Sequence, residues 1–201
     1  PAEEAEPPDL DDVDAALLFG AAHQVDQEDQ HPWLRPEKRL VRALLERGTP
    51  TVGVCFGAQL VAEAAGAVVR PAARPEVGWH EIELLPAAAS DPLLGFLPRR
   101  TEVFSWHSYE CQLPDGATAL ARSDVGLQAF RLDDRPVWGI QFHPEVTEAD
   151  VGSWIDDWPN DAAAQRTGLD PEELRRDTAA KIAAWNDVGR AISERFVAAA
   201  E

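Results

Sequence analysis

A cysteine flanked by glycines stands where an apolar strand gives way to a helix. The β-branched run Thr51–Val54 stops at Cys55, glycines occupy positions 53 and 57, and helix-forming residues follow at once. This order is typical of a nucleophile elbow with cysteine in the place of serine. The amide dipoles at the start of a helix favour a thiolate, and the backbone N–H of Phe56 would bind an oxyanion. The alternative is a buried structural cysteine, which is common for a lone Cys.

A histidine follows a second apolar strand. The run 137–141 leads into the sequence His143-Pro144-Glu145, and His143 lies 88 positions after Cys55. Because the C-terminal ends of parallel strands line one crevice, both side chains can reach the same place. A catalytic cysteine needs a base within hydrogen-bond reach, and that base needs an orienting acceptor, which Glu145 can supply. Taken alone, the segment also fits a surface histidine before a turn proline.

The elements around these motifs alternate between strand and helix. An apolar run at 13–19 ends in Gly20 and predicts a buried strand, 36–47 predicts a helix that stops at Gly48, and 57–65 predicts a second helix. Short strand-like runs separated by Pro, Gly and Asp turns follow at 81–85, 102–106, 118–122, 127–132 and 137–141. We therefore expect a three-layer α/β sandwich, with a mostly parallel central sheet and some antiparallel strands.

The two ends of the chain differ from this core. Residues 1–12 are acidic and contain prolines, so we expect a loop or a ragged end. Over 171–199, apolar residues recur every three or four positions, which predicts a long helix packed on the domain by one stripe. The stripe comprises Leu174, Thr178, Ile182, Trp185, Val188, Ile192 and Phe196. The predicted division is an acidic N-terminus at 1–12, a domain at 13–150 and a helical extension at 151–201.

Composition narrows the classes of partner and compartment. The 201 residues carry 36 Asp and Glu against 18 Lys and Arg, a net charge of −18 that repels phosphate backbones and argues against nucleic acid. No apolar run approaches the roughly 20 residues of a membrane span, and the acidic start is unlike a secretory signal. Two cysteines are too few for a disulfide framework and suit a reducing cytoplasm. His23 and His31 lie in an acidic loop, where solvation is favoured over metal binding, and no metal is expected.

The two motifs together resemble the class I, or triad-type, glutamine amidotransferase domain. The family's elbow reads Gly-x-Cys-x-Gly-x-Gln, and its second signature is an apolar residue before His-Pro-Glu. The matching residues are Gly53, Cys55, Gly57 and Gln59, followed by Phe142, His143, Pro144 and Glu145. Further likeness at 31–34 and 76–79 is to free-standing members related to the amidotransferase domain of GMP synthase. The resemblance implies a flavodoxin-like three-layer fold and no cofactor.

The resemblance also assigns roles residue by residue. Cys55 would be the nucleophile, His143 the general base and acid, and Glu145 the residue that orients His143. Gln59 would help to hold the head group of the glutamine substrate. These roles imply hydrolysis through a glutamyl thioester.

Two further segments match the family less closely. The family's oxyanion loop usually reads Gly-Gly, and the matching pair here is Gly20 and Ala21. Alanine can serve there through its backbone N–H unless the site requires a positive φ. His107 lies in the segment that approaches the glutamine backbone in the family.

The expected reaction is hydrolysis of the side-chain amide of L-glutamine to glutamate and ammonia. No synthase domain is present in this sequence, so a separate synthase partner is the expected acceptor of ammonia. A free-standing γ-glutamyl peptide or amide hydrolase is one alternative. A non-catalytic binding module is another, motivated by Ala21 and by the absence of an opening strand and helix. A cysteine-bearing α/β-hydrolase is weaker, because its acid should precede the histidine.

Overall fold

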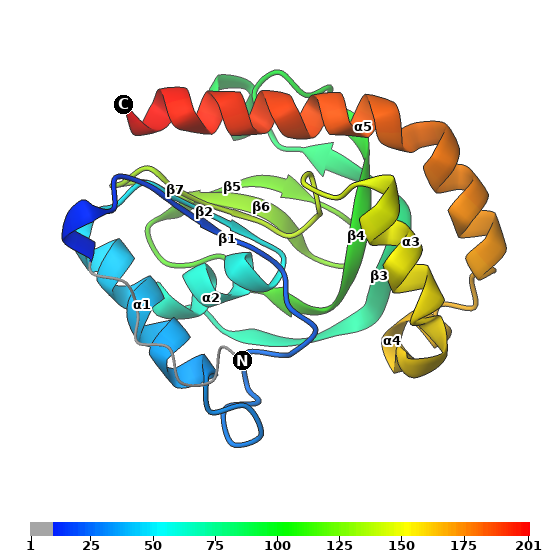
Figure 1. Cartoon of the computed structure of the whole chain (residues 1–201). Coiled ribbons are helices and arrows are strands. Elements are labelled where there is room, and N and C mark those ends of the chain that lie inside the picture. Colours follow the sequence, from blue (N-terminus) through cyan, green and yellow to red (C-terminus); the bar gives the residue numbers. More distant parts are fainter. Residues whose placement is uncertain (1–9) are drawn as a thin grey trace.

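A single seven-stranded mixed sheet lies between two layers of helices in the computed structural model, which describes residues 10–201 (Figure 1). Its strand order is β1-β2-β7-β6-β5-β3-β4. The strands are β1 Ala16–Leu18, β2 Thr51–Val54, β3 Val69–Leu84, β4 Arg100–Cys111, β5 Ala117–Arg122, β6 Leu127–Leu132 and β7 Val137–Ile140. The helices are α1 Leu34–Arg47, α2 Phe56–Ala64, α3 Glu148–Asp156, α4 Ala162–Gln165 and α5 Pro171–Ala200. The expected α/β sandwich is thereby confirmed.

Each face of the sheet buries its own apolar core. One core contains Val41 and Leu44 of α1 with residues of α2, and the other contains Ile182, Ile192 and Phe196 of α5 with residues of β2 and β7. The helices α1 and α2 therefore cover one face, and α5 crosses the opposite face (Figure 1). The parallel part of the sheet is β1-β2-β7, and the remaining four strands are joined antiparallel.

The strand predictions differ from the structure at two places. The expected buried strand at 13–19 is only β1, which forms the sheet edge, so the prediction that the whole run is buried was wrong: Leu17 is 50% and Phe19 52% exposed. The run 81–85 is the end of β3, whose pairing with β4 continues back to Val69 across a register shift between Pro71 and Glu76. Prolines that interrupt the strand pattern hid this continuation.

The long C-terminal helix follows its predicted stripe closely. α5 begins after the capping residue Asp170, and its buried residues are Leu174, Thr178, Ile182, Trp185, Gly189, Ile192 and Phe196. Gly189 replaces Val188 in the predicted set, because the helix approaches the neighbouring backbone most closely there. The predicted boundary at 150 falls inside α3. The division into a domain and an extension stays a prediction, and the predicted ragged end falls mostly on residues outside the described part of the chain; residues 10–12 form a short 3₁₀ helix.

Helix α5 also fixes the segment that carries His143. The Trp185 indole N–H donates to the backbone oxygen of His143 at 2.7 Å, and the Asn186 amide donates to the backbone oxygen of Val146 at 2.7 Å. A Cβ at Gly189 would overlap the carbonyl oxygen of Pro144. These contacts hold residues 143–146 against the helix from both ends, and they leave no room for a side chain between them.

We expect Gly189→Ala to destabilise the fold by about 1–3 kcal/mol, because the added methyl forces α5 away from Pro144. Gly152→Ala is the matched control on α3, where the nearest atom to a new Cβ is the mobile end of Arg175 at 3.4 Å. That control should gain about 0.5–1 kcal/mol from helix propensity alone. Urea denaturation of both variants measures the difference, and equal stabilities would contradict the close packing at Gly189.

Candidate active site

The turn that carries Cys55 is strained in the way the glycine spacing predicts. Cys55 has φ 53° and ψ −109°, and it is the only non-glycine residue with a positive φ in the described part of the chain. A Cβ at Gly57 would overlap the carbonyl oxygen of Leu18 in β1. Such strain persists only where the surrounding structure enforces it, and it is concentrated at functional sites. The turn leaves the Cys55 side chain at the C-terminal edge of the parallel strands.

His143 reaches the same edge because β2 and β7 are parallel neighbours. Val54 pairs with Ile140, and the N–H of Cys55 donates to the carbonyl of Ile140 at 2.7 Å. His143 comes three positions after Ile140, and its imidazole is almost fully buried. Its Nδ1 lies 2.7 Å from Oε1 of Glu145. Because a carboxylate only accepts, Nδ1 carries a proton, and Nε2 is the nitrogen available for chemistry.

The charge on this imidazole is unusually stable. Burial alone lowers the pKa of His143, but the Cys55 sulfur and the Glu145 carboxylate outweigh burial and raise the pKa to about 10. The ring is therefore an imidazolium near neutral pH. Its Nε2 is buried and has no hydrogen-bond partner among the described residues, while the Cys55 Sγ has a long contact of 3.8 Å with the Trp106 carbonyl. A buried proton donor thus stands unengaged beside the thiol.

Gly20 follows β1 and closes the site from a third side. A Cβ there would lie 3.1 Å from Cε1 of His143 and 3.8 Å from the Cβ of Cys55. Ala21 and Ala22 also line the cleft. Ala21 has no positive φ, so the departure from the Gly-Gly pattern carries no backbone strain. The objection that alanine would be penalised at this position does not apply.

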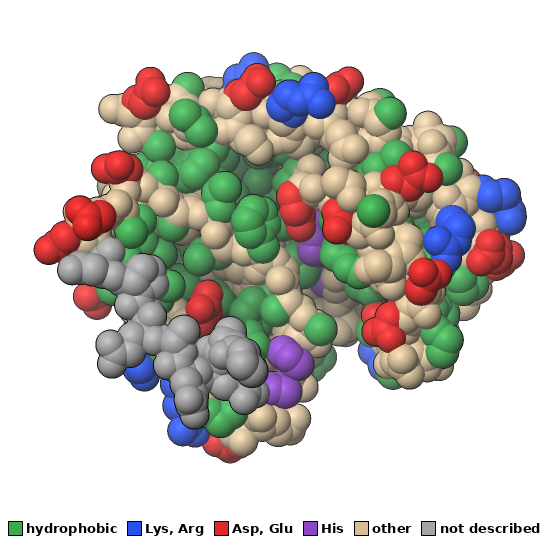
Figure 2. Space-filling view, viewed as in Figure 1, with side chains coloured by type: hydrophobic (Ala, Val, Ile, Leu, Met, Phe, Trp, Pro, Cys, Tyr) green, Lys and Arg blue, Asp and Glu red, His purple; other side chains and the backbone are tan. Residues whose placement is uncertain are grey.

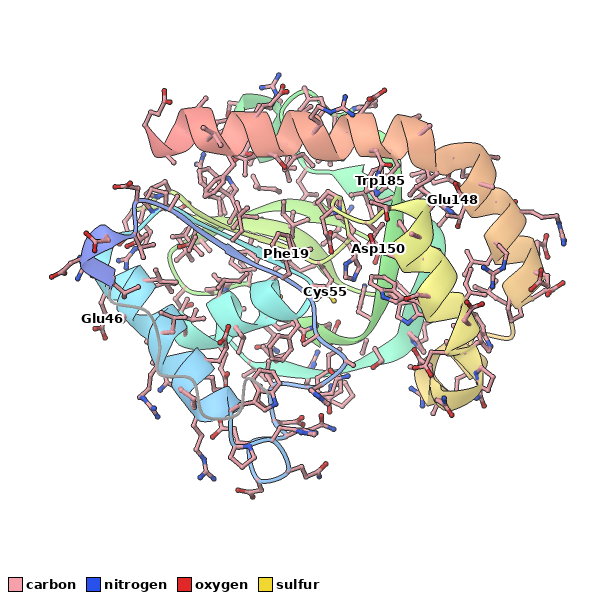
Figure 3. The ribbon with its side chains drawn as sticks, viewed as in Figure 1. Phe19, Glu46, Cys55, Glu148, Asp150 and Trp185 are labelled. Carbon is pink, nitrogen blue, oxygen red and sulfur yellow. The ribbon has the colours of Figure 1, made fainter. Side chains whose placement is uncertain are left out.

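A cleft of about 650 Å³ opens above Cys55 and His143. Its apolar lining includes Phe19, Trp106 and Trp154, and its acidic lining comes from Glu145, Asp150, Asp157 and Asp161. Figure 2 shows histidine and acidic side chains together near the middle of this face. In Figure 3, Cys55 lies between Phe19 and Asp150, which come from opposite walls of the cleft.

Two of the other predicted residues are placed differently from each other. His107 lines the cleft, but its ring is held by the Tyr109 carbonyl at 3.0 Å and lies 3.2 Å from the Glu76 carboxylate. The Phe56 side chain is buried in the core, and its backbone N–H belongs to the first turn of α2, where no intrahelical acceptor exists. Its oxyanion role stays a prediction, as does substrate contact by His107.

Gln59 is turned away from the chemistry. Its side chain is buried, and its amide donates to Oε1 of Gln141 at 3.2 Å and to the Tyr109 carbonyl at 3.4 Å. It is not among the residues that line the cleft. The contact with a glutamine head group that the family motif implies is therefore not supported in this conformation. The side chain instead joins α2 to β4 and to the segment that follows β7.

Cys111 is chemically distinct from Cys55. Both cysteines are free, but burial raises the pKa of the Cys111 thiol to about 12, and it lines no part of the cleft. His23 and His31 stack at 3.8 Å, and no group of three or more metal-ligating side chains occurs within residues 10–201. No helix in that range is long and apolar enough to cross a membrane.

The sequence interpretation missed one wall of the cleft entirely. Asp150, Trp154 and Asp157 of α3 and its C-terminal cap line it, and the Trp154 ring lies 5.0 Å from the His143 ring. Their spacing of four and then three residues places them on one helical face, which was the available signal. Three residues are too few to assign such a face before the position of the helix is known.

Comparison with known proteins places this geometry in a family. A family model described as glutamine amidotransferase class-I matches residues 1–155. The glutamine-hydrolyzing GMP synthase of Thermotoga maritima is 32% identical over 145 residues, which cover 72% of this chain and 26% of that protein. A separate subunit of the glutamine-hydrolyzing GMP synthase of Natronomonas pharaonis is 32% identical over 151 residues, covering 74% of this chain and 75% of that protein.

A solved structure agrees with the sequence matches. The glutamine amidotransferase of Methylobacillus flagellatus superposes with a TM-score of 0.81 at 27% identity, covering 97% of this chain and 80% of that one. The chain thus spans about a quarter of the Thermotoga GMP synthase and three quarters of the Natronomonas protein. On the family match and the shared fold, the chain belongs to the class I glutamine amidotransferases.

Proposed function

We propose that the chain hydrolyses the side-chain amide of L-glutamine to glutamate and ammonia with a triad of Cys55, His143 and Glu145. The observation that carries this proposal is the buried His143 ring, which is hydrogen-bonded to Glu145 and has its pKa raised by Cys55. An imidazolium paired with a cysteine sulfur and oriented by a carboxylate is the arrangement that nucleophilic catalysis by cysteine requires.

In the first half-reaction, the Cys55 thiolate attacks the amide carbon and forms a tetrahedral intermediate. The negative charge on its oxygen is stabilised by the N–H of Phe56 and by the backbone of Gly20–Ala21. Nε2 of His143 gives its proton to the leaving nitrogen as the C–N bond breaks. Ammonia departs, and a glutamyl thioester remains on the sulfur.

In the second half-reaction, water attacks the thioester carbon. His143, now neutral, removes a proton from that water through Nε2, while Glu145 keeps the ring oriented through Nδ1. Collapse of the second tetrahedral intermediate breaks the C–S bond and releases glutamate. The thiolate and imidazolium are then restored, so no cofactor is consumed.

The fate of the ammonia is a further part of the proposal. Two of the relatives are named as separate subunits of glutamine-hydrolyzing GMP synthase, which supports delivery of ammonia to a distinct synthase partner. A γ-glutamyl peptide or amide hydrolase is the second candidate, because the cleft of about 650 Å³ has room beyond a single amino acid. Both reactions use the same thioester chemistry. Both also need Cys55 reduced, which a cytoplasmic location would favour.

Cys55→Ala should abolish glutamine hydrolysis and leave the fold intact, because the sulfur is the nucleophile. Cys111→Ala is the matched control and should keep its activity, since that thiol is buried and lines no part of the cleft. Ammonia release measures turnover, and mass spectrometry after incubation with 6-diazo-5-oxo-L-norleucine should locate one adduct on Cys55. Retained turnover in Cys55→Ala would overturn the assignment of the nucleophile.

Glu145→Gln should weaken the fold by about 1.5–3 kcal/mol near pH 6 and by much less above pH 10. The folded pKa of His143 is raised from 6.5 to about 10, so the stability gained from its proton is complete below the unfolded pKa and is lost as pH rises through the folded one. Removing the Glu145 charge takes away part of that gain. Urea denaturation at both pH values tests this.

Glu148→Gln, which removes a charge from the start of α3, should show no such pH dependence. A loss of stability in Glu145→Gln that is the same at both pH values would mean that the carboxylate does not hold the proton of His143.

A further inference from the structure

Two carboxylates and an indole ring line one wall of the cleft. Asp150, Trp154 and Asp157 follow one another at the spacing of a single helical face, and all three line the cleft. Figure 3 shows Asp150 on the side of α3 that faces Cys55, whereas Glu148 lies on the other side. The two carboxylates therefore flank the indole along the length of the wall.

This wall carries negative charge that no Lys or Arg in the cleft balances. Hydrogen bonds from the side chain and backbone of Thr147 lower the pKa of Asp150, so it stays ionised. Those bonds occupy Oδ2 of Asp150, and Oδ1 of Asp157 accepts from Asn160, which leaves the other oxygen of each without a bond from any described residue. Neither Lys nor Arg is found among the described residues that line the cleft.

Aromatic ring faces accompany these charges. Trp154 packs edge-to-face with Trp106 at 5.5 Å between ring centroids, and both indoles are half-buried and line the cleft. A carboxylate near an exposed indole face is an environment that attracts organic ammonium groups, because the ring quadrupole and the negative charge act together. A ligand with a carboxylate at this position would be repelled by the same groups.

The proton donor of the proposed reaction points a substrate toward this wall. The unpartnered Nε2 of His143 must face the leaving nitrogen, and the His143 ring lies 5.0 Å from Trp154. Any substituent on the leaving nitrogen therefore starts beside α3. Free glutamine has no such substituent and leaves that part of the cleft empty.

We propose that the cleft also takes γ-glutamyl amides whose amine half carries a second, positively charged nitrogen, as in γ-glutamyl diamines, and hydrolyses them in preference to neutral amides. The inference rests on the proposed function, because the same sulfur attacks the γ-carbonyl. The C–N bond breaks, Nε2 of His143 gives its proton to the leaving amine, and water then cleaves the thioester. The products are glutamate and a free diamine, whose distal ammonium takes no part in the bond changes.

The test compares two amides that differ only at the far end of the amine. γ-Glutamyl-1,5-diaminopentane ends in an ammonium group, and γ-glutamyl-n-hexylamide ends in a methyl group of the same size. We expect kcat/KM to be about tenfold higher for the ammonium compound at low salt, and the ratio to fall at high ionic strength. In Asp150→Asn/Asp157→Asn, which keeps the acceptor oxygens and removes the charges, the ratio should approach one. Glu148→Gln should keep the wild-type ratio.

Binding separates failure of this inference from failure of the proposed function. Calorimetry with Cys55→Ala should give a tighter Kd for the ammonium compound even without turnover. Equal or weaker binding and hydrolysis of the ammonium compound, with glutamine still hydrolysed, would overturn the inference and leave the function standing. If Cys55 forms no adduct with 6-diazo-5-oxo-L-norleucine and neither glutamine nor any amide is cleaved, both proposals are wrong.

Discussion

A buried positive charge is the constraint around which this site is built. An ionised group taken out of water costs several kcal/mol unless other charges and hydrogen bonds compensate. The His143 imidazolium has both, from the Glu145 carboxylate on one side and the Cys55 sulfur on the other. Removing either partner leaves an uncompensated charge inside the protein. The geometry of the three residues is therefore tied to the stability of the charge as well as to chemistry.

The fold meets this constraint by bringing two rigid supports together. The parallel pairing of β2 with β7 sets Cys55 and the His143 segment side by side, and the strained turn at Cys55 aims the sulfur at the cleft. Helix α5, which crosses one face of the sheet, fixes the backbone of residues 143–146 through Trp185 and Asn186. The imidazole is thus held by contacts on its ring and, separately, by contacts on its backbone.

Much of this arrangement was predictable from local patterns. The glycines around Cys55 predict the elbow, and strand ends predict that Cys55 and His143 share an edge, because both are consequences of backbone geometry. The exposure of Leu17 was not predictable, since an edge strand has the same apolar sequence as a central one. Gln59 shows a different limit, because a motif cannot say whether an amide will bond to a substrate or to Gln141. The α3 wall acquires meaning only once the helix is docked.

The position of α5 along the chain bears on when the site can first operate. The elbow at Cys55 is synthesised more than a hundred residues before Trp185 and Asn186. At about 5–20 residues per second, several seconds pass between the two during translation. Until α5 packs, the segment with His143 lacks its backbone anchors, and the sulfur has no fixed imidazolium beside it. Maturation of the thiol as a nucleophile is therefore timed by the last helix described, and nascent chains are kept from hydrolysing amides before they can fold.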